Sequence, residues 1–191
     1  MKKETLTQML TRMFSLSTVI SICLFASCSD DPEATNEEEV ITTVIVTLQP
    51  AEGETVTLTW DDTNLDAVVD ESEIVVSKSL ISSTAYGATI QLLNKSADPV
   101  TDITEEVKDE DEDHIFCFTV TTVGIAITNL SKDSNELPVG ITSTWTTSAP
   151  STSGTVTITL RHQPGVKTGD CPGAGDTDAS ITFPISVGIP V

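Results

Sequence analysis

Apolar and polar residues alternate with a period of two along much of this chain, and no other feature limits its fold as strongly. In residues 54–60, Val56, Leu58 and Trp60 share one parity and threonines occupy the other. Successive side chains of a β-strand point to opposite faces, so such a segment presents one apolar face to a core. β-branched residues dominate these segments, as is usual in strands. The alternation therefore predicts a protein built from strands.

About eight segments carry this pattern: residues 40–48, 54–60, 73–81, 84–94, 114–120, 140–145, 154–162 and 179–187. The segments between them are rich in Gly, Pro, Asn, Asp and Ser, which favour turns. A helical pattern is limited to residues 103–108, where we expect Thr104 to cap a single turn. Many short strands joined by polar turns favour an all-β, antiparallel two-sheet sandwich of the immunoglobulin-like kind.

Residues 1–27 have the organisation of a secretory signal peptide, with a basic beginning and an apolar stretch at residues 14–25. That stretch is shorter than the roughly 20 residues that cross a bilayer. Cys28 and the small residues before it resemble a bacterial lipobox, although Phe25 stands where lipoboxes usually carry Leu. The resemblance implies cleavage before Cys28 and attachment of two or three acyl chains, enough for stable anchoring. The alternative is an ordinary signal peptide that leaves Cys28 as a free thiol.

The residues after Cys28 are acidic. Residues 29–33 (SDDPE) resemble the signal that sends lipoproteins to the outer face of the outer membrane in Bacteroidota-type bacteria. Residues 28–39 are highly charged and show no apolar period, so we expect a lipidated cysteine followed by a disordered tether. Residues 40–191 then form a single β-sandwich domain.

Acidic residues dominate the composition of the mature chain. Cleavage before Cys28 removes three basic residues and one acidic residue, which changes the formal net charge from −20 to −22. Six basic residues remain, at positions 78, 95, 108, 132, 161 and 167. Nucleic-acid binding requires a basic surface that neutralises phosphates, so the composition excludes nucleic acid as a partner. The expected membrane contact is made through the lipid on Cys28.

Three stretches, TAYGATIQLLN, DITEEVKDEDEDHIFCF and GTVTITLRHQPG with the later GDTDASITFPISV, resemble a family of small Bacteroidota-type outer-membrane lipoproteins. The resemblance extends over nearly all of the mature chain. It implies a signal peptide, a lipid-modified cysteine, an acidic tether and one β-rich domain, and it implies no particular chemistry. Residues 60–70 (WDDTNLDAVVD) lack the glycines of the family's Gly/Asp-rich loop, which weakens a calcium loop there.

Two acidic clusters are candidate calcium sites, because calcium takes six to eight oxygen ligands. The first is Asp109, Asp111 and Asp113 in the run DEDED, and the second is Asp170, Asp176 and Asp178 in GDCPGAGDTD. The other interpretation, which we favour, is two solvated acidic loops, because runs of like charge repel each other and stay hydrated.

His114 and His162 are the two histidines of the chain, and their spacing does not select a metal site. We expect His114 to lie at the end of a strand and His162 to order the RHQPG turn. No Gly-x-Ser-x-Gly motif accompanies the abundant serines, so we expect no catalytic residues, no cofactor and no metal ligand.

Cys117 and Cys171 remain in the mature domain after Cys28. An even pair in an exported protein favours a disulfide, and the alternative is that Cys117 is a buried apolar side chain. The resemblance points to the alternative, since relatives carry an aromatic residue at that position.

Together these features predict a lipid-anchored outer-membrane or cell-surface lipoprotein that acts as a non-enzymatic interaction or structural module, with an unidentified protein or glycan partner. The second candidate is an accessory lipoprotein that binds a glycan or a calcium ion. Glycan binders usually expose aromatic side chains, whereas Trp60, Tyr86 and Trp145 all fall on the core-facing parity. A hydrolase is the third and weakest candidate.

Overall fold

The computed structural model describes residues 39–121 and 124–189, which include nearly all of the predicted β domain. The predicted signal peptide, the predicted lipidation site Cys28 and the part of the predicted tether before Glu39 lie outside the described residues. In the part of the chain that the structure describes, no helix has the length and hydrophobicity needed to span a membrane.

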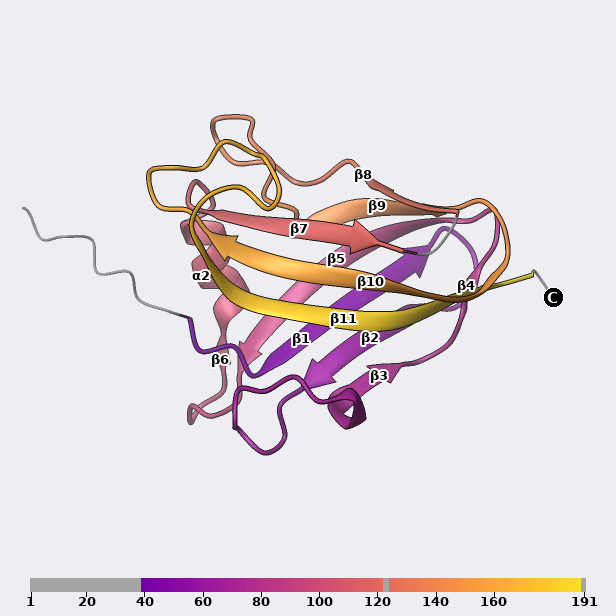
Figure 1. Cartoon of the computed structure of the whole chain (residues 1–191), viewed down its shortest axis with the longest axis horizontal. Coiled ribbons are helices and arrows are strands. Elements are labelled where there is room, and N and C mark those ends of the chain that lie inside the picture. Colours follow the sequence, from indigo (N-terminus) through magenta and orange to yellow (C-terminus); the bar gives the residue numbers. More distant parts are fainter. Residues whose placement is uncertain (1–38, 122–123, 190–191) are drawn as a thin grey trace, which may run out of the picture. The chain divides into compact units, whose positions relative to one another are not determined.

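Two sheets form the domain, and Figure 1 shows β7, β10 and β11 in one layer with β1, β2 and β5 in the other. The larger sheet has the order β3-β2-β1-β5-β9-β8, with β6 paired to β5. Its strands are β1 (Thr43–Pro50), β2 (Val56–Asp61), β3 (Ile74–Val76), β5 (Ala85–Asn94), β6 (Thr101–Asp102), β8 (Ile125–Thr128) and β9 (Thr142–Thr147). The smaller sheet has the order β4-β11-β10-β7, with β4 (Leu80–Ile81), β7 (His114–Val120), β10 (Ser151–His162) and β11 (Asp176–Gly188). The predicted all-β, two-sheet sandwich is confirmed, and its immunoglobulin-like character stays a prediction.

The core lies between the two sheets and consists mainly of Val, Ile and Leu. The alternation places the inward rows as predicted: Val44, Val46 and Leu48 of β1 are at most 1% exposed. Outward-facing hydroxyls pair across neighbouring strands instead, for example Thr157 with Thr182 at 2.8 Å between their Oγ1 atoms. This division of apolar and hydroxyl side chains is what a sandwich with two solvated outer faces requires.

The two tryptophans and the one tyrosine lie in this core, as their parity predicts. Trp60 is 3% exposed, Tyr86 1% and Trp145 0%. They therefore do not form the exposed aromatic surface that glycan binders usually present.

Residues 73–81 do not form the single strand that the sequence predicts. They include the end of a short 3-10 helix, η1 (Glu71–Glu73), and then two strands, β3 and β4, that belong to different sheets. β3 ends before Ser77, whose side-chain Oγ accepts a hydrogen bond from Thr57 N of β2 at 2.9 Å. Leu80 then enters the core and is 1% exposed. β4 pairs with β11 in parallel, which is the one parallel pairing between the described strands of an otherwise antiparallel sandwich.

The single helix turn predicted near residue 103 is present as α2 (Ile103–Asp109), but Thr104 is not its cap. Asp102 is the N-cap, and its Oδ1 accepts a hydrogen bond from Thr104 N at 3.0 Å. The Thr104 hydroxyl has another role, because it accepts a 2.8 Å hydrogen bond from Leu92 N of β5. This contact fastens α2 to the larger sheet, and α2 leads directly into the turn before β7.

Candidate functional site

The two histidines lie beside each other at one end of the smaller sheet. His114 begins β7 and His162 ends β10, and the antiparallel register makes them direct cross-strand partners. Their rings stack, with centroids 4.6 Å apart and an interplanar angle of 5°. Both share the inward parity of the core residues of their strands, so His114 is 0% exposed and His162 is 7% exposed.

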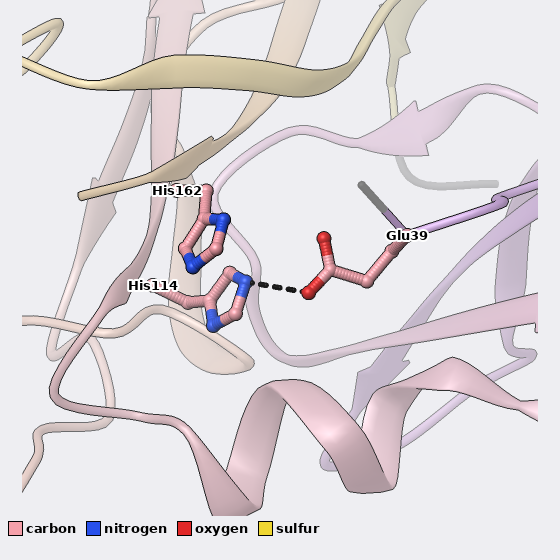
Figure 2. A group of neighbouring side chains, drawn as sticks. All are labelled: Glu39, His114 and His162. Atoms are coloured by element: carbon pink, nitrogen blue, oxygen red, sulfur yellow. Dashed lines mark ion pairs between the residues drawn. The ribbon is translucent and has the colours of Figure 1, made fainter. Parts of the chain in front are cut away.

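Glu39 approaches this pair from the segment that leads into β1, and Figure 2 shows its carboxylate directed at His114. Oε1 of Glu39 lies 3.0 Å from Nε2 of His114, and the carboxylate side chain is 6% exposed. Glu39 was expected to be the last residue of a disordered tether. In the structure its side chain is buried against the domain. Burial of a carboxylate is costly unless the carboxylate is paired, and His114 provides the partner.

Protonation at this pair follows from its contacts. Burial alone would raise the pKa of Glu39, but the contact with His114 and its charge outweigh burial and leave that pKa below its ordinary value. Burial alone would lower the pKa of His114, but the contacts with Glu39 and the Glu110 carbonyl leave it above its ordinary value. The two directions agree, because the contact between Glu39 and His114 favours the charged form of both side chains.

A second carboxylate, that of Asp178, adjoins the same histidine. Its Oδ2 lies 3.9 Å from Nε2 of His114, and its side chain is 1% exposed. The pairing of β10 with β11 shifts register between Leu160 and Arg161, whose partners are Ala179 and Thr177. Asp178 is the additional residue at this bulge, and bulges redirect side chains in this way. The acidic residue is therefore brought to the histidine pair by an irregularity of the strand.

A cavity of about 530 Å³ opens beside these residues. Glu39, Asp178, Trp60 and Asp62 contribute to its lining, together with apolar residues of the loop after β2 such as Leu65. Asp62 shapes that loop, since its carboxylate accepts hydrogen bonds from Asp66 N at 3.2 Å and Ala67 N at 3.0 Å. The cavity gives solvent a route to the two carboxylates next to His114.

Among the described residues, Glu39, His114 and His162 are the group of His, Cys, Asp and Glu that is arranged to hold a metal ion, with ligand atoms within 4.8 Å of one another. Asp109, Asp111 and Asp113 do not form such a group. Asp109 ends α2, and the Asp113 carboxylate accepts a hydrogen bond from Gly165 N at 3.2 Å. Asp170 likewise accepts from the Thr168 hydroxyl within its own loop.

The second predicted acidic cluster is divided between different environments. Asp176 is exposed and is the cross-strand partner of His162, whereas Asp178 is buried beside His114. The RHQPG turn is ordered by Gln163 and not, as predicted, by His162. The side-chain Nε2 of Gln163 donates to Ala174 O at 2.6 Å, and the backbone carbonyl of Gln163 accepts from Val166 N at 3.0 Å.

Cys117 and Cys171 are joined by a disulfide in the structure, so of the two alternatives for these residues the bridge is the one present. It connects β7 to the loop that follows β10. A buried ion pair fastens the same loop: Lys167 Nζ lies 2.7 Å from Asp133 Oδ2, and the two side chains are 2% and 0% exposed. These restraints hold the loops next to the histidine pair.

Sequence reasoning did not find the histidine pair, although a signal for it exists. If residues 114–120 pair antiparallel with residues 156–162, His114 and His162 must face each other, as they do. Nothing in the sequence indicates that Glu39 and Asp178 join them.

Comparison with protein-family models, with curated proteins and with solved structures finds no match for this chain.

Proposed function

We propose that this chain is an exported lipoprotein, anchored in the outer membrane through Cys28, whose β-sandwich acts as a non-enzymatic interaction or structural module at the cell surface. The observation that carries the proposal is the disulfide between Cys117 and Cys171. Disulfides form and persist in oxidising compartments and are rare in the cytosol. Export of the domain fits the signal-peptide pattern before Cys28, and the acidic residues that follow favour delivery to the outer face.

The fold fits a module held outside the membrane. The outward rows of the smaller sheet pair through hydroxyl groups, such as Thr159 with Ser180 at 2.9 Å. The formal net charge of −22 after cleavage before Cys28 keeps such a surface hydrated and discourages aggregation. No nucleic-acid partner is proposed, because the few basic residues cannot form a phosphate-binding surface.

Metabolic labelling tests the anchor. The full chain, expressed in a bacterium that processes lipoproteins, should incorporate an alkyne analogue of palmitate, and Cys28→Ser should abolish the label. Ser29→Ala is the matched control and should stay labelled. Equal labelling of the wild-type and Cys28→Ser chains, or no labelling of either, would overturn the proposal. Protease treatment of intact cells then tests the outer face, where the domain should be digested without lysis.

A second candidate function is an accessory binding lipoprotein, and the cavity lined by Trp60, Asp62 and Asp178 favours it. Its ligand would be a calcium ion or a small glycan that the carboxylates contact. Ala67→Trp should block the cavity, and Val75→Trp, at an exposed site outside the lining, is the control. Calorimetry with calcium chloride and with a panel of oligosaccharides should detect binding that Ala67→Trp removes. Absence of binding to every probe would exclude this function.

A further inference from the structure

We propose that Glu39, His114 and His162 form a binding site for a divalent transition-metal ion, with Zn²⁺ as the best match. The three residues come from three separate segments: the entry to β1, the start of β7 and the end of β10. Their ligand atoms lie within 4.8 Å of one another. This site goes beyond the proposed function, because neither the lipid anchor nor a module role requires a metal.

The orientation of His114 is that of a metal ligand. Its Nδ1 lies 3.1 Å from the carbonyl oxygen of Glu110, which only accepts hydrogen bonds, so Nδ1 carries a proton and donates. Metal-binding histidines usually donate their second ring nitrogen in this way, which fixes the tautomer and the ring. Nε2 is left facing the carboxylate of Glu39, as Figure 2 shows. A neutral Nε2 lone pair would repel that carboxylate, so the space between them must hold a proton or a metal ion.

Two further ligand atoms are buried without a hydrogen-bond partner among the described residues. They are Nδ1 of His162 and Oε2 of Glu39. Burial of a polar atom without a partner costs about 1–3 kcal/mol, so such atoms need an explanation. A metal ion bound to His162 and Glu39 would satisfy both atoms at once.

The carboxyl groups around His114 favour a cation. Those of Glu39 and Asp178 lie 3.0 and 3.9 Å from Nε2 of His114. An ion bound at Nε2 would therefore have carboxyl oxygens of both residues close to it. Glu39 and Asp178 also line the cavity, so an ion that enters from solvent meets the carboxylates first.

The donor set selects the class of ion. Two imidazole nitrogens and a carboxylate are typical ligands of Zn²⁺, whereas Ca²⁺ takes six to eight oxygens. Zinc–ligand bonds of about 2.0–2.1 Å place neighbouring ligands of a tetrahedral ion roughly 3.3 Å apart. The contact between Glu39 and His114 already has nearly this spacing. The stacked ring of His162 must tilt toward the ion, and a water or Asp178 would complete the coordination.

The site would also connect the tether to the domain. Glu39 is the residue at which the acidic tether meets the sandwich, and the two histidines belong to the smaller sheet, whereas β1 belongs to the larger one. A bound ion would therefore join the entry segment to the opposite sheet. An ion that binds the folded domain and not the unfolded chain stabilises the folded domain by mass action.

Calorimetry on the full chain, purified in detergent without a histidine tag and stripped with EDTA, tests the proposal. Zinc chloride should bind with a stoichiometry of one and raise the melting temperature. His162→Gln and Glu39→Gln should each weaken binding by about 10- to 100-fold or more, the loss seen even for supporting residues around metal sites. Glu52→Gln removes the same charge at an exposed position and should bind as the wild type does.

Three results would overturn the zinc site or the choice of ion. No zinc binding at 100-fold molar excess over the protein would overturn the site. So would binding that His162→Gln and Glu39→Gln leave unchanged, which would indicate adventitious ions on an acidic surface. Tighter binding of calcium chloride than of zinc chloride would overturn the choice of ion. Near-ultraviolet circular dichroism of the metal-free variants confirms folding. Cobalt chloride should produce the visible bands of a tetrahedral site with the wild type and Glu52→Gln, and not with His162→Gln or Glu39→Gln.

Discussion

Removal of the disulfide between Cys117 and Cys171 should destabilise the domain by a predictable amount. The two cysteines are separated by 54 positions, so the bridge closes a long loop that contains the end of β7 and all of β8, β9 and β10. In the unfolded chain this closure removes many conformations that the reduced chain can visit. For a loop of this length the chain-entropy relation gives about 4 kcal/mol at 25 °C.

The folded state should survive the loss. The loop that carries Cys171 is also held by the buried pair of Lys167 and Asp133 and by the hydrogen bonds of Gln163. The change should therefore appear as lower stability of the same fold. For a domain of about 150 residues, 4 kcal/mol corresponds to a decrease in Tm of about 8–16 °C.

Urea unfolding, followed by tryptophan fluorescence, measures this difference. Trp60 and Trp145 are both in the core, so their emission reports exposure of the sandwich interior. The free energy of unfolding of the double variant Cys117→Ala with Cys171→Ala should equal that of the wild type measured in a phosphine reductant. Reductant should leave the free energy of unfolding of the double variant unchanged. A difference below about 1 kcal/mol between oxidised wild type and the double variant would refute the loop-entropy reasoning.

Three other predictions concern polar groups that the fold buries or caps. Lys167→Met leaves the Asp133 carboxylate buried without its cation and should cost about 3–5 kcal/mol in a urea titration, more than Lys167→Met combined with Asp133→Asn. Burial alone would raise the pKa of Asp133, but the contact with Lys167 and the backbone hydrogen bonds from Leu137 and Asn135 outweigh burial and hold that pKa below its ordinary value. The pair thus stabilises the fold above the unfolded pKa, and the free energy of unfolding should fall below about pH 4 more steeply in the wild type than in Lys167→Met. Asp102→Ala removes the cap of α2 and should cost about 1 kcal/mol. Thr104→Ala should cost about 1–3 kcal/mol instead, because Leu92 N in the sheet loses its acceptor. Thermal unfolding compares the last two variants, and equal effects would show that Thr104 has no separate role.

The alternation in the sequence was sufficient to predict the sandwich because period-two segments bury one face whatever their order. It placed Val56, Leu58 and Trp60 in the core, where they are at most 3% exposed. It failed for residues 73–81, where Ser77, Lys78 and Ser79 separate two short apolar stretches and the backbone crosses from one sheet to the other. The crossing is fixed by contacts from distant residues, such as the Thr147 hydroxyl, which donates to Ile81 O at 2.6 Å. A local pattern carries no information about such contacts.

The short strand β8 was missed for a related reason. Ile125 and Ile127 alternate with small residues, but the segment has four residues and its inward side chains are only partly buried. Its place at the edge of the larger sheet depends on pairing with β9, where Ile127 faces Trp145. Edge strands of this length give too little pattern to be separated from a loop.

The histidine site was harder to predict than the fold, because it depends on four segments far apart in the chain. Register alone joins His114 to His162, but a bulge brings Asp178, and Glu39 precedes the first strand altogether. Once assembled, the site is held firmly. Gln163 N donates to Asp113 O at 2.6 Å, so the residues flanking the two histidines are bonded directly to each other.

This support bears on how the end of the sandwich would bind an ion. Lys167 Nζ donates to Asp111 O at 2.6 Å, and the disulfide fixes the same loop to β7, so the segment before His114 cannot move without breaking several contacts. A ligand that binds prearranged groups loses less free energy to ordering them than one that must fold its site. Glu39 comes from a different segment, the entry to β1, and an ion would replace its 3.0 Å contact with His114. Val166→Ala, in the exposed loop after His162, should therefore leave zinc affinity unchanged.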